Sequence, residues 1–112
     1  MARPVKPRIV CSSPKFNVFG NNNNIDVVIM TYEEYEVIRL IDYNNLSQEE
    51  ASKFMDVART TVQGIYESAR KKISDSIVNG KTLKIEGGNY NLCTSMEMGR
   101  NCNRRICRRF ND

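Results

Sequence analysis

The chain has 112 residues, 40% of them hydrophobic and 27% charged, with a net charge of +4, which indicates one ordinary globular domain. It contains no histidine, which excludes Ser–His–Asp triads, Cys–His nucleophilic pairs and histidine metal sites, so we expect no enzyme. No apolar run approaches the ~20 residues that span a bilayer, and the first residues lack the apolar stretch of a signal peptide, so we expect a cytoplasmic protein without a membrane segment.

Residues 1–24 are predicted to form a basic N-terminal arm and loop. The first fifteen residues hold four basic side chains, Arg3, Lys6, Arg8 and Lys15, and no acidic one. The prolines favour extended backbone, and the asparagine run that follows favours a loop. Basic arms bind phosphate backbones without reading sequence, and Arg3 and Arg8 are candidates for entering a minor groove. The alternative is a solvated tail that keeps the protein soluble.

The predicted domain spans residues 25–88. Ile25–Met30 is apolar and rich in β-branched residues, which favours a strand. Thr31 and Glu34 follow with the spacing of a capping box and predict a first helix from about Tyr32 to Asp42. Three acidic side chains of this helix offer a surface to a protein partner: Glu33, Glu34 and Glu36.

Residues 46–70 are typical of a helix-turn-helix, in which the second of two closely linked helices enters a DNA groove. Ser47 and Glu50 form a second capping box, which predicts a helix from about Gln48 to Met55. The turn that follows, at Asp56–Ala58, has an aspartate where positive φ is expected. It also has an alanine where a hydroxyl would cap the next helix, a loss of about 1 kcal/mol.

A long third helix is predicted from about Arg59 to Val78, and the Asn79-Gly80 pair ends it. Five apolar residues recur every three or four positions and form its predicted buried stripe: Val62, Ile65, Ala69, Ile73 and Ile77. After this helix, Lys81–Glu86 alternates polar and apolar residues. This pattern predicts a strand that pairs with Ile25–Met30.

The start of the third helix leaves an outward face that can reach base edges. Arg59 carries the fork of donors that fits guanine, and the amide of Gln63 fits adenine. Thr60 and Thr61 can contact a phosphate or a thymine methyl group. The alternative is an ordinary solvated helix face.

Further along the same helix, Gly64 leaves room for close approach to the duplex, and Glu67 completes the outward face. Three basic residues come a turn or more later: Arg70, Lys71 and Lys72. We expect them to meet the phosphate backbone, and the alternative is an interaction with the dipole of the helix.

Residues 89–112 are predicted to form a Cys/Arg-rich tail, with five arginines near its end and little periodicity. Cys93, Cys102 and Cys107 lie in this tail, and Cys11 lies far away in sequence. If Cys11 folds back to join them, four thiolates can hold zinc or an iron–sulfur cluster. The alternatives are reduced thiols with no common site and a redox switch.

Five segments together resemble a known family, called domain of unknown function 134 or uncharacterised protein family 0251. In chain order they read M-A-R-P-x-K-x-R-x-V-C, E-Y-E-V-I-R-L-I-D, L-S-Q-E-E-A, A-R-K-K-I and G-K-T-L-K-I-E-G-G. The resemblance covers about residues 1–90 and implies DNA binding, because the helix-turn-helix of the family is similar to region 4 of sigma factors. Asp56 and Ala58 depart from the turn glycine and the serine cap of the family. Some members carry a second domain similar to dinitrogenase iron–molybdenum cofactor proteins, for which this chain is too short.

The sequence therefore predicts a mainly α fold: a three-helix helix-turn-helix domain with a small two-stranded, winged-helix-like β element between two basic ends. The expected function is binding of double-stranded DNA in transcription regulation, as a homodimer, because one short reading helix buries little surface. The alternatives are a protein-interaction module and a metal or iron–sulfur sensor that uses the four cysteines.

Overall fold

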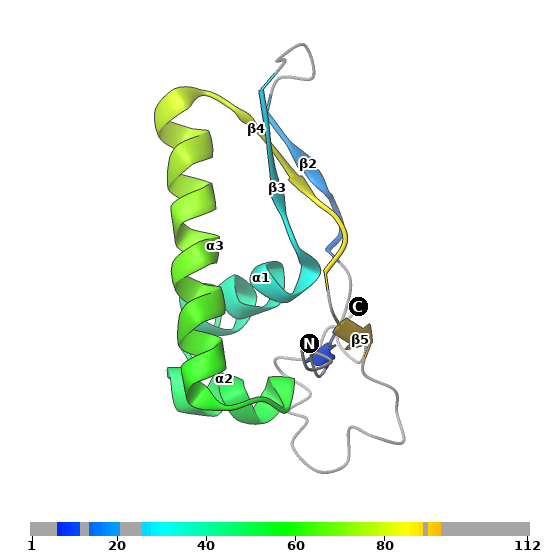
Figure 1. Cartoon of the computed structure of the whole chain (residues 1–112), viewed down its shortest axis with the longest axis vertical. Helices are drawn as coiled ribbons and strands as arrows, with labels where there is room; N and C mark the ends of the chain where they lie inside the picture. The colour runs from blue at the N-terminus through cyan, green and yellow to red at the C-terminus, as the bar shows by residue number, and fades with distance from the viewer. Residues whose placement is uncertain (1–6, 12–13, 21–25, 89, 93–112) are drawn as a thin grey trace, which may run out of the picture.

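Helices make up most of the domain. The structure, a computed structural model of the chain, describes residues 7–11, 14–20, 26–88 and 90–92. Three α-helices and one π-helical segment follow one another: α1 (Tyr32–Val37), η1 (Ile38–Tyr43), α2 (Gln48–Met55) and α3 (Arg59–Asn79). The long helix α3 stands beside a small sheet, and the shorter helices pack across its first half (Figure 1). The predicted three-helix fold is confirmed.

The first helix begins at the predicted capping box. The Thr31 amide donates to Glu34 Oε1 at 2.8 Å, and the Glu34 amide donates to Thr31 Oγ1 at 3.2 Å. The helix continues without a break from α1 into η1, whose wider π turns were not predicted. Two consecutive residues of η1, Arg39 and Leu40, are both buried.

The second helix and the turn after it also follow the sequence. Ser47 and Glu50 form the second capping box, with amide-to-side-chain distances of 2.8 and 3.0 Å. Asp56 ends α2 with φ 58° and ψ 47°, the left-handed conformation that the sequence assigned to it. Ala58 is the N-cap of α3 and provides no side-chain hydrogen bond. The turn therefore forms without a glycine at its left-handed position and without a hydroxyl residue at the N-cap of α3, the two residue types that would stabilise it most.

A core between the helices fixes the angle at which α3 leaves the turn. Its fully buried members come from α1, η1, α2 and the start of α3: Val37, Leu40, Ala51, Met55 and Val62. The predicted stripe on α3 is confirmed at Val62 and Ala69, which are buried, and at Ile65 and Ile73, which are half-buried. The prediction is wrong at Ile77, which is 75% exposed, because the last turns of α3 extend beyond this core.

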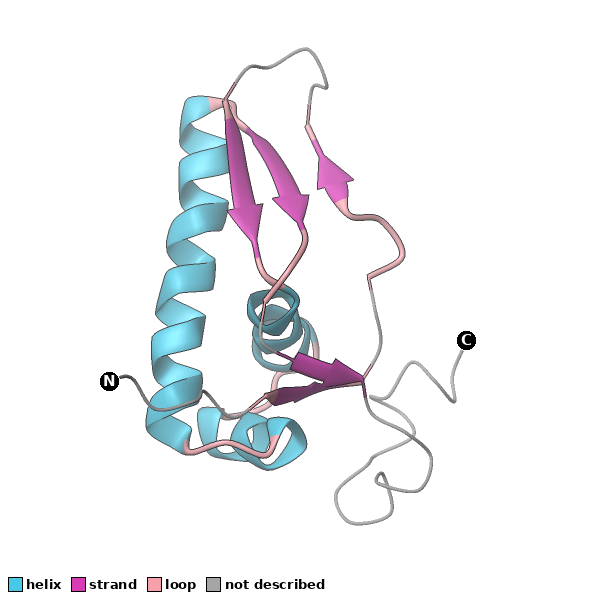
Figure 2. Cartoon of the chain, turned by 45° about the vertical axis from the view of Figure 1, so that its right-hand side comes forward, coloured by secondary structure: helices cyan, strands magenta, loops and turns pink. Residues whose placement is uncertain are grey.

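The sheet has three strands instead of the two predicted. As predicted, β3 (Val27–Met30) pairs with β4 (Thr82–Ile85), and the two strands are parallel. On the other side of β4, β2 (Val18–Phe19) adds an antiparallel strand, which gives the order β2-β4-β3. Helix α3 lies along this sheet and contacts β3 and β4 (Figure 2).

Two further strands pair outside this sheet. β1 (Arg8–Val10) runs parallel to β5 (Tyr90–Leu92), and the pair lies below the three-stranded sheet, near α2 (Figure 2). Val10 and Cys11 are buried at the end of β1. The segment predicted as an N-terminal arm thus contributes two strands, β1 and β2, and two buried residues to the described domain. Among the described residues, every helix is too short or too polar to cross a membrane.

Candidate nucleic-acid interface

The first half of α3 presents an exposed face on the side opposite its buried residues. Val62 and Ala69 are fully buried, and residues that point away from them along the same turns reach solvent. The structure brings together six predicted site residues here, of which Thr61 is half-buried and the others are exposed: Arg59, Thr60, Thr61, Gln63, Gly64 and Glu67. We call this set the reading face.

Gly64 lies in the middle of the reading face and has open space around it. A Cβ atom at Gly64 would have no heavy atom within 4 Å. Packing within the described part of the chain therefore gives no reason for a glycine at this position.

Arg59, the first residue of α3, contacts the first residue of α2. Its Nη1 donates to Oε1 of Gln48 at 3.3 Å. The contact joins the N-terminal ends of two helices, and sequence reasoning missed it because Gln48 was assigned only to the start of α2.

Arg70, Lys71 and Lys72 have different surroundings, although all three were expected to contact the phosphate backbone. Lys72 Nζ lies 2.8 Å from Glu34 Oε1, and Arg70 Nε lies 3.8 Å from Asp42 Oδ2. Lys71 is exposed on the side of the helix that continues the reading face. The arrangement leaves Lys71 better placed than Lys72 to meet an external phosphate.

Tyr66 connects Asp42 and Arg70 beside the reading face. Its hydroxyl donates to Asp42 Oδ1 at 2.7 Å, and the Arg70 guanidinium lies 5.3 Å from its ring centroid. The bond to Asp42, together with burial, raises the pKa of Tyr66 above its usual value. The Tyr66 hydroxyl thus links η1 to α3 through its hydrogen bond to Asp42.

The prediction of an acidic surface on the first helix is wrong, because two of the three glutamates in this helix are buried. Glu36 is fully buried and accepts two hydrogen bonds from Arg39, at 2.9 and 2.8 Å. Burial alone would lower the pKa of Arg39, but the bonds to Glu36 outweigh it and raise this pKa. Glu34 is 5% exposed and binds Lys72. These carboxylates hold the domain together instead of facing a partner.

Of the two N-terminal arginines predicted to contact DNA, only Arg8 lies among the described residues. Arg8 lies in β1 with a side chain that is 15% exposed, and its Nε lies 3.7 Å from Glu33 Oε2. An approach of Arg8 to a minor groove would have to separate this pair. Arg3 lies outside the described residues.

Comparison with known proteins assigns the chain to a family. The model of the family described as "Protein of unknown function DUF134" matches residues 1–93. The chain belongs to this family. It is 54% identical over 103 residues to a UPF0251 protein of Desulfitobacterium hafniense strain Y51, covering 88% of this chain and 82% of that protein. It is 38% identical over 109 residues to a UPF0251 protein of Methanococcus vannielii, covering 94% and 78%. No solved structure matches the chain.

The cysteines of this DUF134 chain are only partly described. Cys11 is buried, and its backbone amide donates to Glu36 Oε2 at 3.1 Å. Cys93, Cys102 and Cys107 lie outside the described residues, and the last two also lie beyond the family match. Within the described ranges, no cluster of three cysteine or carboxylate side chains is arranged to hold a metal ion. The predicted zinc or iron–sulfur site therefore stays a prediction.

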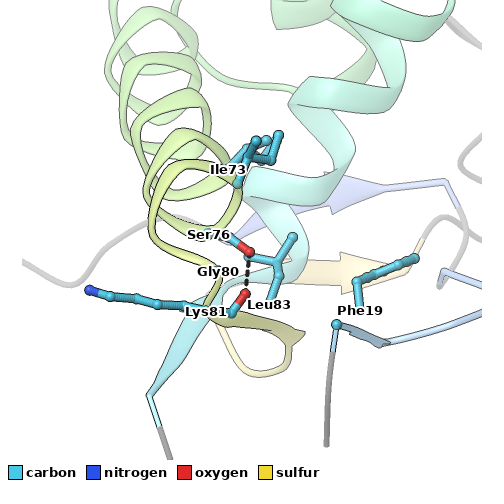
Figure 3. A pocket seen from close by; sticks show the side chains of 8 residues that line it. Phe19, Ile73, Ser76, Gly80, Lys81 and Leu83 are labelled. Atoms are coloured by element: carbon cyan, nitrogen blue, oxygen red, sulfur yellow. Dashed lines mark hydrogen bonds between the residues drawn. The ribbon is translucent and has the colours of Figure 1, made fainter. Parts of the chain in front are cut away.

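An open apolar groove lies at the other end of α3 of this DUF134 domain. It encloses about 450 Å³ between the last turns of α3 and strands β2 and β4. Phe19, Ile73 and Leu83 line it, and the Ser76 hydroxyl donates to the Lys81 carbonyl at its edge (Figure 3). Sequence reasoning missed this groove, because Ile77, which also lines it, was expected to be buried.

Proposed function

We propose that this protein binds double-stranded DNA and reads its sequence in the major groove with the first half of α3, as a transcriptional regulator of the cytoplasm. The observation that carries the proposal is the reading face itself. It follows a short turn after α2 and is held outward by a core that the three helices share. This geometry supports the proposal, because it is similar to the arrangement by which helix-turn-helix proteins present their second helix to bases.

The residue types on the reading face suit base reading. The guanidinium of Arg59 matches the acceptors O6 and N7 of guanine, and the amide of Gln63 matches N6 and N7 of adenine. Thr60 and Thr61 offer hydroxyls to phosphate and methyl groups to thymine. With no histidine in the chain and no catalytic constellation on this face, we propose a binding protein and no enzyme.

We also propose that two copies bind together on one operator. A single helix of this length buries little DNA surface, and a dimer doubles the number of bases that are read. A target of this kind has two half-sites related by two-fold symmetry and spaced by about one helical turn. A symmetric motif in the selected DNA therefore supports the dimer.

The test is selection of bound fragments from a random duplex pool by the purified full chain at about 150 mM salt, where nonspecific phosphate contacts are weakened. We expect one motif to be enriched by the natural protein. The combined change Arg59→Ala and Gln63→Ala should abolish this enrichment, because it removes the two side chains best suited to base edges.

The matched control carries Lys84→Ala and Glu86→Ala, which remove an ion pair at the end of β4, outside the residues of the reading face. This variant should enrich the same motif as the natural protein. Absence of any motif, or the same motif from the Arg59 and Gln63 variant, would refute the proposal. The protein-interaction and metal-sensor hypotheses would then be favoured.

A further inference from the structure

The contact between Gln48 and Arg59 joins two helix starts at the edge of the reading face. Gln48 is the first residue of α2, and Arg59 is the first residue of α3. Arg59 Nη1 donates to Gln48 Oε1 at 3.3 Å, and the pair is exposed to solvent. An exposed arginine that is held in one place loses less side-chain freedom when it binds.

Arg59 differs from the basic residues further along α3 in the group that accepts its hydrogen bond. Arg70 and Lys72 lie beside the carboxylates of Asp42 and Glu34, which offset the charge of Lys72 and part of the charge of Arg70. The acceptor that holds Arg59 is a neutral amide, so the guanidinium keeps its full positive charge. Only one of its five N–H donors is used in this bond, and the others are enough for the two acceptors of a guanine.

The same geometry leaves hydrogen-bonding capacity on Gln48. A glutamine amide has one acceptor oxygen and two N–H donors. The oxygen accepts from Arg59, and the two N–H groups suit a phosphate oxygen, the group that side-chain amides commonly contact on duplex DNA. One residue of α2 can therefore connect the DNA backbone to a base-reading residue of α3.

We infer that Gln48 is a positioning residue: it holds Arg59 for a guanine in the target and anchors itself on the neighbouring phosphate. The inference rests on the proposed function and specifies it further. It predicts a guanine in each half-site whose recognition depends on Gln48, although Gln48 itself touches no base.

The experiment tests the hydrogen-bond acceptor and the donors of the Gln48 side chain separately. Gln48→Lys keeps a phosphate donor and removes the acceptor for Arg59. Gln48→Glu keeps acceptors for Arg59 and removes the donors. Each full-length variant is titrated with the selected duplex and with duplexes in which single base pairs are changed, and Arg59→Ala identifies the guanine that Arg59 reads.

We expect Gln48→Lys to reduce discrimination at that guanine by about tenfold, with other positions unchanged. Gln48→Glu should keep the discrimination, because the carboxylate still accepts from Arg59, and should weaken binding to all duplexes alike, because the carboxylate faces phosphate and offsets the charge of Arg59. The matched control is Glu49→Gln, which makes the same change in net charge as Gln48→Lys on the adjacent exposed residue. It should leave discrimination at the guanine unchanged.

Three outcomes would overturn the inference. If Arg59→Ala abolishes discrimination and Gln48→Lys leaves it intact, Gln48 does not position Arg59, and the proposed function stands. If Gln48→Lys weakens discrimination at positions that Arg59→Ala leaves unaffected, the change distorts α2 in general. If Arg59→Ala alters no position, the reading-face proposal fails and the inference fails with it.

Discussion

At the scale of single residues, Gly64 stands out because the described structure gives no packing reason for a glycine at this position. Glycine in an exposed helix interior costs about 1 kcal/mol relative to alanine. An added Cβ at Gly64 would meet no heavy atom of another part of the described structure within 4 Å, so packing there does not explain this cost. Close approach of a ligand backbone is a common reason for such a glycine.

We predict opposite effects of Gly64→Ala on stability and on binding. The free energy of unfolding, measured with denaturant, should rise by about 0.5–1 kcal/mol, because alanine favours the helix. Affinity for the selected duplex should fall about tenfold or more, because the methyl group prevents close approach. Unchanged affinity would remove Gly64 from the reading face.

Gly88→Ala is the contrasting control. Gly88 has φ +114°, and its added Cβ would lie 2.6 Å from Glu33 Oε1 and 2.9 Å from Thr31 Cβ. We expect this change to destabilise the fold by about 1–3 kcal/mol. The two glycines thus distinguish a structural requirement from a functional one in the same assay.

At the scale of elements, one carboxylate ties the first helix to the third. Glu34 caps the start of α1 through the Thr31 amide, and its oxygens also accept from Lys72 Nζ and from the Ser68 hydroxyl on α3. Burial alone would raise the pKa of Glu34, but these hydrogen bonds outweigh it and hold the pKa below its usual value. Folding therefore stabilises the ionised form of this side chain.

This lowered pKa predicts acid-labile stability. A carboxyl group whose pKa is depressed by folding contributes stability above its unfolded pKa of about 4.3, and the contribution is lost as pH falls through the folded pKa. Lys72→Met should lower the free energy of unfolding by about 1–2 kcal/mol at pH 7 and by less at low pH. Denaturant unfolding at several pH values measures both. Lys71→Met, an exposed neighbour without this bond, should change little at any pH.

At the scale of the whole molecule, the basic residues are unevenly distributed along the chain, and some of them are already paired with carboxylates. Four basic residues lie in residues 1–15 and five in residues 99–112, while the middle of the chain is acidic on balance. Within α3, carboxylates already neutralise Lys72 and partly neutralise Arg70. Of the three consecutive basic residues, Lys71 is the one we expect to displace counterions from DNA.

The salt dependence of binding tests this assignment. Plotted as logarithms, affinity for duplex DNA falls with salt with a slope of about −0.9 for each phosphate neutralised. Lys71→Gln should reduce this slope by about 0.9 for each bound copy, and Lys72→Gln should leave it unchanged. Equal effects of the two changes on the slope would show that the ion pair with Glu34 opens on binding.

The helices could be predicted from the sequence because their signals are local. The capping boxes at Thr31 and Ser47 and the stop at Gly80 each involve residues within a few positions of one another. The same helical spacing also predicted which residues of α3 face outward, from Arg59 to Glu67.

What could not be predicted depends on partners far away in sequence. Strand β2 has two residues, too few for a pattern, and it exists because Val18 pairs with Lys84. The burial of Glu36 required its bond to Arg39 and a covering segment from the N-terminus. The ion pair that engages Lys72 required the position of α1 against α3. The exposure of the residues on the reading face was thus predicted, and the ion pairs beside it were not.

The pairing of β1 with β5 has a consequence for synthesis on the ribosome. β1 is translated near the beginning of the domain, and its partner β5 is translated at the end. The helices contact one another within residues 32–79 and can pack as soon as these residues have left the exit tunnel, whereas the β1–β5 pairing must wait for residue 92. The nascent chain can therefore complete its helices before β1 is paired, and the β1–β5 pair forms only after residue 92 has emerged.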